Sequence, residues 1–431
     1  MIDPSALALR PEPFGGILFD PLDATFVELD REAYDALAAF ARTGSAPAEA
    51  APLFDDLRDT LSTFDGRPLR LTGDPAIRPR ADGLAVLSGP TLVDFQITDH
   101  CPLDCPHCYA ESTPAGRHGA LDDILMALDQ IAEVGAFQLA IGGGEPLSHP
   151  HIGAILARCR ALGMVPNLTT SGVGLTDAKL DLLADHCGAV GVSLEGVGDD
   201  FAAYRKSGFT RFERTVSALQ DRGVPTVLQV TLNTDTFARL PQITAYIESL
   251  DGLYGVIFLA FKPVGRGAAF GRPLADLPPA QVHAGLEAAF TTLARRTRVG
   301  FDCCLTPAVA GLMAGDLEGP GPDESTAAHA ADHLEGCSAL RSSLGLSPTL
   351  DVMPCTFTAA HAVGNLKDRH LRDIWRDMAT ERWRHALAAR TGGGGNTANP
   401  RCAACGNRAA CLGGCPVMDL ANCDRDYLGR T

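Results

Sequence analysis

The chain has 431 residues, of which 46% are hydrophobic and 20% are charged, and its formal net charge is −16. This composition is ordinary for a globular protein and excludes disorder as the dominant state. So acidic a chain lacks the positive charge that nucleic-acid binding through phosphate contacts requires. No apolar run approaches the roughly 18 residues of a membrane span, and the N-terminus lacks a signal-peptide pattern. We therefore expect a soluble, cytoplasmic protein that binds neither nucleic acid nor membrane, with about three domains.

The N-terminal region predicts a small domain of its own. Two short strands are expected over residues 15–21 and 25–30. Asp30 then has the position of a helix N-cap, with Glu32 in the first turn, and a second helix is expected over 51–64. A segment of this size buries only a thin core, so from the pattern alone it is equally well a subdomain without a role of its own.

Six apolar segments in the middle of the chain alternate with amphipathic segments, at intervals of about 30 residues. The apolar segments predict strands over 92–97, 137–141, 165–170, 189–194, 226–232 and 255–261. The amphipathic segments predict helices near 119–135, 151–163, 176–186, 211–222 and 239–250. This alternation predicts a parallel sheet with helical crossovers, either an open doubly wound sheet or a full or partial barrel.

Polar, Gly or Cys residues follow each of the six predicted strands. In strand order they are Cys101, GGGEP at 142–146, the turn at 169–172, Ser193 with Glu195, the pair at 232–233 and the pair at 262–263. The C-terminal ends of parallel strands meet on one face, which is where α/β folds place their chemistry. The six motifs are therefore expected to converge on one site.

The composition is unusual in its 14 cysteines. Disulfides do not persist in a reducing compartment, so metal or redox chemistry is the leading explanation. Cys101, Cys105 and Cys108 have the spacing CxxxCxxC on the loop after the first predicted strand. They either bind a structural zinc with a fourth ligand such as His100 or His107, or hold a [4Fe–4S] cluster with one iron left open.

This cysteine loop, followed by GGEP at 143–146, resembles the radical S-adenosylmethionine (SAM) superfamily. The resemblance implies an α/β fold with a partial (β/α)6 barrel, in which the three thiolates hold a [4Fe–4S] cluster. It also implies that the open iron is chelated by the amino and carboxylate groups of SAM. One electron, from a donor such as ferredoxin or flavodoxin, then cleaves SAM to a 5′-deoxyadenosyl radical that abstracts a hydrogen atom.

The resemblance further implies contacts to SAM. Glu145 resembles the acceptor for the methionine ammonium, His107 the residue that meets adenine, and Arg205 the partner of the SAM carboxylate. Ser193 and Glu195 resemble the strand that holds the ribose hydroxyls, where members of the family usually have Asp. The expected SAM-binding residues are His107, Gly143, Gly144, Glu145, Pro146, Thr170, Ser171, Ser193, Glu195, Arg205 and Leu232. Lys262 and Arg266 are expected to line the substrate cavity.

A second cysteine motif lies at the C-terminus. Residues 402–415 carry the spacing CX2CX5CX3C and are followed by Cys423, which by spacing alone also suits a zinc ribbon. With Cys337 and Cys355 upstream, the pattern resembles the SPASM domain of radical SAM peptide-modifying enzymes, although Leu350 occupies the position of the usual Gly.

The SPASM resemblance implies two auxiliary [4Fe–4S] clusters, and so three clusters in all. The ligands implied for the first are Cys337, Cys355 and Cys415, and for the second Cys402, Cys405, Cys411 and Cys423. The fourth position of the first cluster is either open or non-Cys, the alternative we favour, or filled by Cys303 or Cys304.

The N-terminal region resembles the RiPP recognition element, a winged-helix-like α+β domain that binds the leader of ribosomally synthesised, post-translationally modified peptides (RiPPs). In that fold the leader adds as an extra strand to a small sheet. The implied domains are a recognition domain over 1–88, a radical SAM barrel over 89–300, and a SPASM domain with a bridging region over 301–431.

The sequence therefore predicts a radical SAM maturase that modifies a ribosomally synthesised precursor peptide. The expected product carries a crosslink or another oxidative side-chain or backbone modification. Two alternatives stay open: an enzyme that forms formylglycine, similar to anaerobic sulfatase maturases, and a zinc-stapled binding module without catalysis. The sequence names neither the peptide nor a catalytic acid or base.

Overall fold

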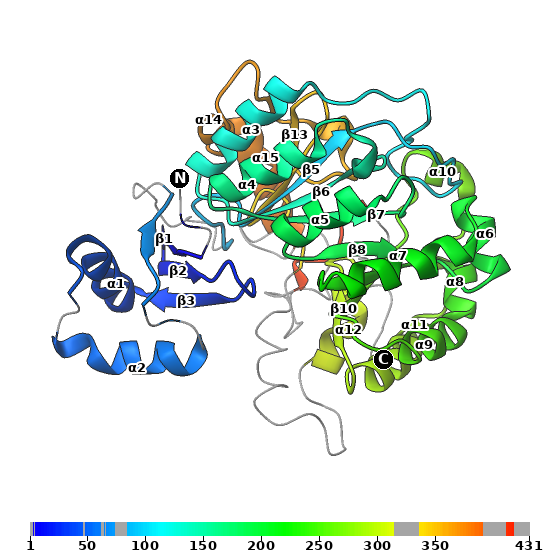
Figure 1. The fold of residues 1–431 in the computed structure, drawn as a ribbon, viewed down its shortest axis with the longest axis horizontal. Coiled ribbons are helices and arrows are strands. Elements are labelled where there is room, and N and C mark those ends of the chain that lie inside the picture. Colours follow the sequence, from blue (N-terminus) through cyan, green and yellow to red (C-terminus); the bar gives the residue numbers. More distant parts are fainter. Residues whose placement is uncertain are drawn as a thin grey trace.

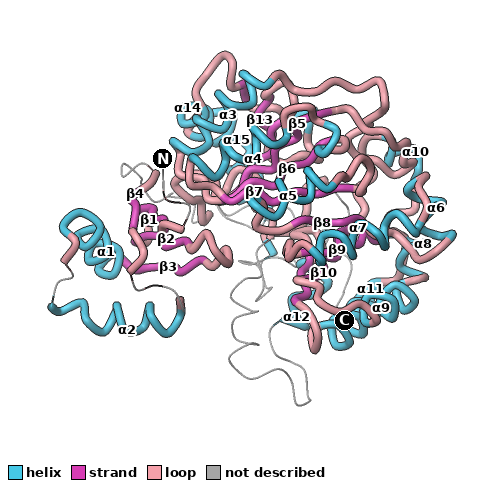
Figure 2. The backbone as a smooth tube through the Cα atoms, viewed as in Figure 1, coloured by secondary structure: helices cyan, strands magenta, loops and turns pink. Residues whose placement is uncertain are grey.

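The computed structural model describes residues 5–45, 48–61, 66–73, 84–313, 336–390 and 411–417, together with Asp3 and Phe64. These residues form a four-stranded N-terminal sheet and a ten-stranded sheet (Figure 1). In Figure 2 the small sheet lies beside the large one, with its two helices on the side away from the large sheet. None of the helices in the described ranges is long and apolar enough to cross a bilayer.

The N-terminal domain has the strand order β3-β2-β1-β4. Its elements are β1 (Leu7–Glu12), β2 (Gly15–Phe19), β3 (Phe26–Asp30), α1 (Arg31–Thr43), the 3-10 turn η1 (Ala48–Ala50), α2 (Ala51–Thr60) and β4 (Leu69–Leu71). The predicted strands correspond to β2 and β3, and Asp30 caps α1 as expected, because its carboxylate accepts a hydrogen bond of 2.8 Å from the backbone N–H of Ala33. The sequence prediction missed β1 and β4.

Both faces of this small sheet are buried. Leu7 and Leu9 pack against α1 and α2, whereas the alternate residues of β1 face the large sheet. Arg10 donates hydrogen bonds to the carbonyls of Pro90 (2.8 Å) and Gly135 (2.9 Å), and its guanidinium lies 4.6 Å from the centroid of the Phe137 ring. The N-terminal domain is thus held against the barrel by buried contacts rather than by its linker alone.

The large sheet has the order β11-β10-β9-β8-β7-β6-β5-β12-β13-β14 and is open at both ends. Its parallel strands are β5 (Leu92–Thr98), β6 (Gln138–Gly143), β7 (Val165–Thr170), β8 (Val190–Ser193), β9 (Thr226–Leu232), β10 (Gly255–Ala260) and β11 (Arg298–Phe301). The strand β12 (Ser343–Leu346) pairs in parallel with β5, and β13 (Asp351–Met353) and β14 (Gly364–Asn365) continue antiparallel. The prediction of an α/β fold with an open, partial barrel and a small N-terminal domain is confirmed.

The crossover helices pack around the sheet. The five predicted helices correspond to α3 (Leu121–Glu133), α4 (Ile152–Ala161), α5 (Asp177–His186), α7 (Phe209–Asp221) and α9 (Leu240–Glu248). The remaining helices are η2 (Pro146–Ser148), α6 (Asp199–Arg205), α8 (Thr234–Ala238), α10 (Arg266–Phe270), η3 (Leu274–Asp276), α11 (Pro279–Leu293), α12 (Thr306–Met313), η4 (Ala359–His361), α14 (Leu371–Trp375) and α15 (Met378–Arg390). Cys159 and Cys187 are buried in this core, as small apolar residues are.

Two features of the C-terminal part were not expected. The strands β12–β14 belong to the same sheet as the barrel strands and extend it. The predicted domain boundaries stay predictions. Leu350, where the SPASM resemblance implied Gly, has a φ of 70°, and its N–H donates to the carbonyl of Ser347 (3.0 Å). Leu350 therefore adopts the left-handed turn that Gly would supply, at a cost of about 1–2 kcal/mol, and its side chain is fully buried.

Candidate active site

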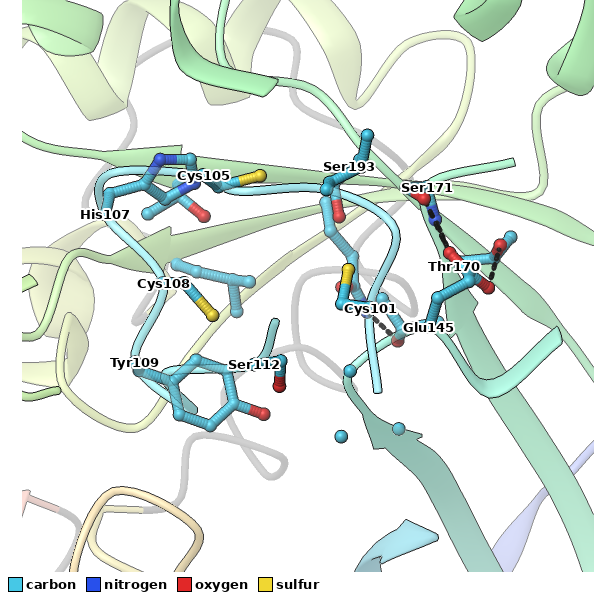
Figure 3. Close-up of a pocket in the computed structure, with 18 of the residues that line it drawn as sticks. Cys101, Cys105, His107, Cys108, Tyr109, Ser112, Glu145, Thr170, Ser171 and Ser193 are labelled. Carbon is cyan, nitrogen blue, oxygen red and sulfur yellow. Dashed lines mark hydrogen bonds between the residues drawn. The ribbon is translucent and has the colours of Figure 1, made fainter. Parts of the chain in front are cut away.

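A cavity of about 320 Å³ opens at the C-terminal ends of the barrel strands. Five of the six predicted strand-end motifs contribute to its wall, and the cysteine loop closes one side (Figure 3). The lining includes Cys101, Cys105, His107, Cys108, Gly143, Gly144, Glu145, Thr170, Ser171, Ser193, Arg205, Lys262 and Arg266. The structure thus brings most of the predicted site residues together around one space.

The cysteine loop is pinned in place by Arg266. The Nε of Arg266 donates to the carbonyl of Cys105 (3.0 Å), and the Nη1 of Arg266 donates to the carbonyl of Ser112 (2.8 Å). Burial raises the pKa of Cys101 to about 11 and also raises the pKa of Cys105. The loop therefore needs a cationic centre, such as iron, to hold these sulfurs as thiolates.

The glycines of the GGEP motif let β6 approach the cysteine loop. The N–H of Gly144 donates to the carbonyl of Thr98 (2.7 Å), and the N–H of Glu145 donates to the carbonyl of His100 (2.9 Å). A Cβ atom at Gly143 would lie 2.3 Å from the carbonyl oxygen of Thr98, and one at Gly144 would lie 2.1 Å from that of His100. The close backbone approach expected of these glycines is made to the loop that carries the cysteines.

Glu145 is fully buried and braces β6 against β7. Its Oε1 accepts hydrogen bonds from the Thr170 hydroxyl (2.7 Å) and the Leu147 N–H (3.1 Å). Its Oε2 accepts from the N–H (2.8 Å) and the hydroxyl (2.5 Å) of Ser171. Burial raises the pKa of Glu145, and the four hydrogen bonds oppose that shift. Because a carboxylate has about four acceptor sites, contact with an ammonium would require one of these bonds to yield.

Glu195 and Arg205 form a buried, bidentate ion pair. The Nε of Arg205 donates to Oε2 of Glu195 (2.5 Å), and another Arg205 nitrogen donates to Oε1. The Nε2 of His107 lies 3.6 Å from the same Oε1. Burial alone would raise the pKa of Glu195, but Arg205 and His107 lower it to about 2. Glu195 therefore orients both residues from behind, because Arg205 and His107 line the cavity and Glu195 does not.

Two buried polar atoms on the cavity wall have no hydrogen-bond partner among the described residues. They are Nδ1 of His107 and the hydroxyl of Ser112. An unpaired buried polar atom costs about 1–3 kcal/mol, so a polar ligand that reaches both atoms would recover that cost. The cavity therefore suits a ligand with several hydrogen-bonding groups, such as SAM.

A second group of thiols lies beside the cavity. The thiols of Cys304 and Cys415 are hydrogen-bonded to each other, and Cys337 and Cys355 lie close enough to Cys415 to interact electrostatically. Cys411, which is close to Cys415 in the sequence, is also buried. Both residues lie in the short described segment 411–417. The remaining predicted ligands, Cys402, Cys405 and Cys423, lie outside the described residues.

Lys262 separates this thiol group from the cavity. Its ammonium donates to Asp302 (2.5 Å) and to the carbonyl of Ala260 (3.0 Å), and it lies 4.4 Å from the centroid of the Phe357 ring. Burial alone would lower the pKa of Lys262, but Asp302 and the sulfur of Cys304 raise it well above its usual value. A fixed positive charge therefore stands between the cavity and the second thiol group.

The comparison with known families accounts for both cysteine groups. The family described as the radical SAM superfamily matches residues 95–246, and SPASM, an iron–sulfur cluster-binding domain, matches residues 337–406. The chain belongs to the radical SAM superfamily. The protein is accordingly a radical SAM enzyme that uses SAM and iron–sulfur clusters, and the alternative of a zinc-stapled module without catalysis was wrong.

Relatives and solved structures agree with this assignment. A PqqA peptide cyclase of Ruegeria pomeroyi is 29% identical over 67% of this chain and 75% of its own. A pre-heme d1 synthase of Dinoroseobacter shibae is 25% identical over 76% of this chain and 82% of its own. Streptococcus suis SuiB, solved with the precursor peptide SuiA, has a TM-score of 0.70 at 17% identity and covers 99% of this chain and 98% of its own. At that identity the match with SuiB shows the fold alone.

The radical SAM site fits an iron–sulfur cluster better than a single ion. Among the described residues, no three Cys, His, Asp or Glu side chains gather closely enough to hold one metal ion. Three thiols on a loop that faces a cavity suit the larger [4Fe–4S] cluster, which supplies the electron that cleaves SAM. Cys101, Cys105 and Cys108 would hold this cluster.

Three predicted SAM contacts do not reach the cavity wall. Pro146 begins η2, Leu232 is fully buried in the core at the end of β9, and Glu195 lies behind Arg205. The roles of the individual SAM-binding residues stay predictions. The sequence prediction missed Asp94, although a carboxylate in the middle of the apolar strand β5 is a signal that could have identified it as a cavity residue.

Proposed function

We propose that this radical SAM enzyme modifies a ribosomally synthesised precursor peptide. The 5′-deoxyadenosyl radical would abstract a hydrogen atom, and the product would carry a crosslink or another oxidative side-chain or backbone modification. The observation that carries the proposal is the small N-terminal sheet, which is docked on the barrel at the N-terminal ends of β6 and β7. The SuiB fold, solved with a precursor peptide, extends over this N-terminal domain as well.

The leader of that peptide would bind along β3. This strand is an edge of the N-terminal sheet and pairs only with β2 among the described strands, so an extended peptide can add to it. A groove of about 470 Å³ begins at Asp30, the last residue of β3, and runs between α1 and α2. Its rim carries Asp30, Glu32, Asp35, Glu49 and Asp56, and its floor carries Ala33, Ala36, Ala39, Ala50 and Leu53. This chemistry suits a leader with basic and small apolar residues.

The direct test is co-expression of the enzyme, under anaerobic conditions, with each short open reading frame that flanks its gene. We expect one of these peptides to be recovered with a loss of hydrogen, measured by high-resolution mass spectrometry and located by fragmentation. The Cys101→Ala enzyme is the matched control and should return the same peptide unmodified.

The same peptide tests the leader site. Charge reversal by Glu32→Lys together with Asp35→Lys should weaken its binding about tenfold or more at low salt, measured by fluorescence anisotropy without SAM. If this variant still modifies the peptide and binds it as tightly as the wild type does, the leader binds at another site. If no flanking peptide is altered by the wild-type enzyme that cleaves SAM, the peptide proposal itself fails. Formation of formylglycine from a Cys or Ser would favour the alternative activity, for which the N-terminal domain is not needed.

We further propose three [4Fe–4S] clusters, with Cys304 as the fourth ligand of the first auxiliary cluster beside Cys337, Cys355 and Cys415. The buried Cys304 thiol is hydrogen-bonded to Cys415, whereas Cys303 is partly exposed and contacts the group through Cys304. From the sequence we favoured an open or non-Cys fourth position in this cluster. The contact between Cys304 and Cys415 instead favours a cysteine ligand there. A ferredoxin or flavodoxin donor and a cytoplasmic location stay predictions.

The matched pair Cys304→Ser and Cys303→Ser tests the ligand. We expect Cys304→Ser to lose about one cluster's worth of iron and sulfide, or to change the EPR spectrum of the auxiliary cluster, because one thiolate is replaced. Cys303→Ser should leave both readouts unchanged. An effect confined to Cys303→Ser would assign that residue instead, and wild-type spectra in both variants would leave the iron open.

A further inference from the structure

Asp94 is a carboxylate that the proposed site does not yet use. It lies in the middle of β5, where its neighbours Val93 and Phe95 are fully buried in the core and its own side chain lines the cavity. Of the cavity-lining residues that the structure describes, only Asp94 and Glu145 carry a carboxyl group. Because the hydrogen-bonding capacity of Glu145 is filled by its four donors, Asp94 is the cavity carboxylate with acceptor capacity to spare.

The surroundings of Asp94 hold it in place without neutralising it. The hydroxyl of Thr356 donates to its Oδ2 (2.9 Å), and the phenol of Tyr109, which is hydrogen-bonded with Thr356 and Gln96, lies close by. Burial raises the pKa of Asp94 to about 6, and the hydrogen bond from Thr356 offsets part of that shift. Near neutral pH the group is therefore an ionised carboxylate that is more basic than an ordinary Asp, as a general base should be.

Asp94 also lies between the two cysteine groups. Tyr109 directly follows Cys108 and contacts the Phe357 ring, at 4.5 Å between centroids, while Thr356 directly follows Cys355. Across the sheet, Asp94 is paired with Ala140 on β6 and Gly345 on β12, neither of which can titrate. Within the described structure, the charged or titratable residue facing it from the cysteine loop is Tyr109, and Lys262 lines the same cavity.

We propose that Asp94 is the proton acceptor of the oxidative step, an inference that rests on the proposed peptide-modifying function. Hydrogen abstraction breaks one substrate bond to hydrogen, forms 5′-deoxyadenosine and leaves a substrate radical. Conversion of that radical to the oxidised product releases one electron and one proton. An oxidised auxiliary iron–sulfur cluster held by Cys337, Cys355 and Cys415 would take up the electron, and the proton passes to a carboxylate oxygen of Asp94, which becomes the neutral acid.

The test compares Asp94→Asn with the wild-type holoenzyme, using the flanking peptide that the wild-type enzyme modifies, in D2O. We expect the variant to form 5′-deoxyadenosine at a rate close to wild type, but to make product about 100-fold more slowly. The substrate radical should instead be reduced by one electron from the dithionite that drives SAM cleavage and take up one deuteron from solvent, so that unmodified peptide returns with one deuterium. Asp94→Glu, which keeps the carboxylate, should recover part of the product.

The pH profile separates a proton acceptor from a structural residue. Product formation by the wild-type enzyme should fall as the pH drops below about 6, because protonated Asp94 cannot accept a proton, and Asp94→Asn should lose this dependence. Asp99→Asn, at an exposed position at the end of the same strand, is the matched control and should keep the wild-type rate and profile. Product formation at the wild-type rate in Asp94→Asn, or loss of 5′-deoxyadenosine formation together with product, overturns the role. A wild-type enzyme that modifies no peptide refutes the proposed function first.

Discussion

Replacement of Cys101 by Ala is expected to reduce 5′-deoxyadenosine formation to the level of a protein-free control. Cys101 lies on the cavity wall with Cys105 and Cys108, and two thiolates do not hold a [4Fe–4S] cluster that keeps one iron open for SAM. The measurement is liquid chromatography with mass spectrometry on protein reconstituted anaerobically with iron, sulfide, SAM and dithionite.

Cys159→Ala provides the control for loss of a thiol. Cys159 is fully buried within α4, and burial raises the pKa of its thiol far above the usual value, so it is a packing residue. This variant should keep its clusters and its SAM cleavage. Cleavage of SAM by Cys101→Ala at the wild-type rate would remove the loop from the radical SAM site.

Replacement of Arg205 by Met is expected to lower the free energy of unfolding by about 3–5 kcal/mol, because Glu195 is left as a buried charge without its partner. SAM cleavage should fall as well, since Arg205 lines the cavity. The variant is compared with wild type by thermal unfolding of the reconstituted protein under anaerobic conditions.

The pH dependence gives this prediction a definite sign. In the wild type the pKa of Glu195 is lowered to about 2, so the ion pair stabilises the fold above the pKa of the unfolded chain, and that stabilisation is lost as the pH falls toward 2. In Arg205→Met, burial dominates and the pKa of Glu195 rises, so the deficit should be largest at neutral pH and shrink on acidification. Glu195→Gln in the same chain should restore most of the lost stability. Equal deficits in the single and double variants would show that the pair is not the cause.

The parts of the fold that the sequence predicts are those with strong local patterns. The strands β5–β10 are apolar segments bounded by polar or Gly residues, and each was found within a few residues of its expected place. The strands β1, β4 and β11–β14 are short or interrupted by charged, Pro or Gly residues, and they become strands through their neighbours in the sheet. Local sequence propensity does not predict such pairing between distant segments.

The site also has a part that the sequence predicts and a part that only the fold brings together. Cys101, Cys105 and Cys108 lie on one short segment and GGEP is a second short motif, so the spacing within each motif predicts its chemistry. The pairing of Glu195 with Arg205, the four hydrogen bonds on Glu145 and the thiol contact between Cys304 and Cys415 join residues from different elements. Such contacts depend on how the chain returns to the same place, which motif spacing does not specify.

The extension of the barrel sheet by β12, β13 and β14 has a consequence for electron movement. The cysteine loop follows β5, and Cys355 follows β13, so both sulfur groups are anchored to one continuous hydrogen-bonded sheet. Within the described residues, β12 joins these anchors directly, because it pairs with β5 on one side and with β13 on the other. We therefore expect the distance between the cysteine loop and Cys355 to stay constant during turnover, so that peptide arrival rather than domain motion sets the timing of each turnover.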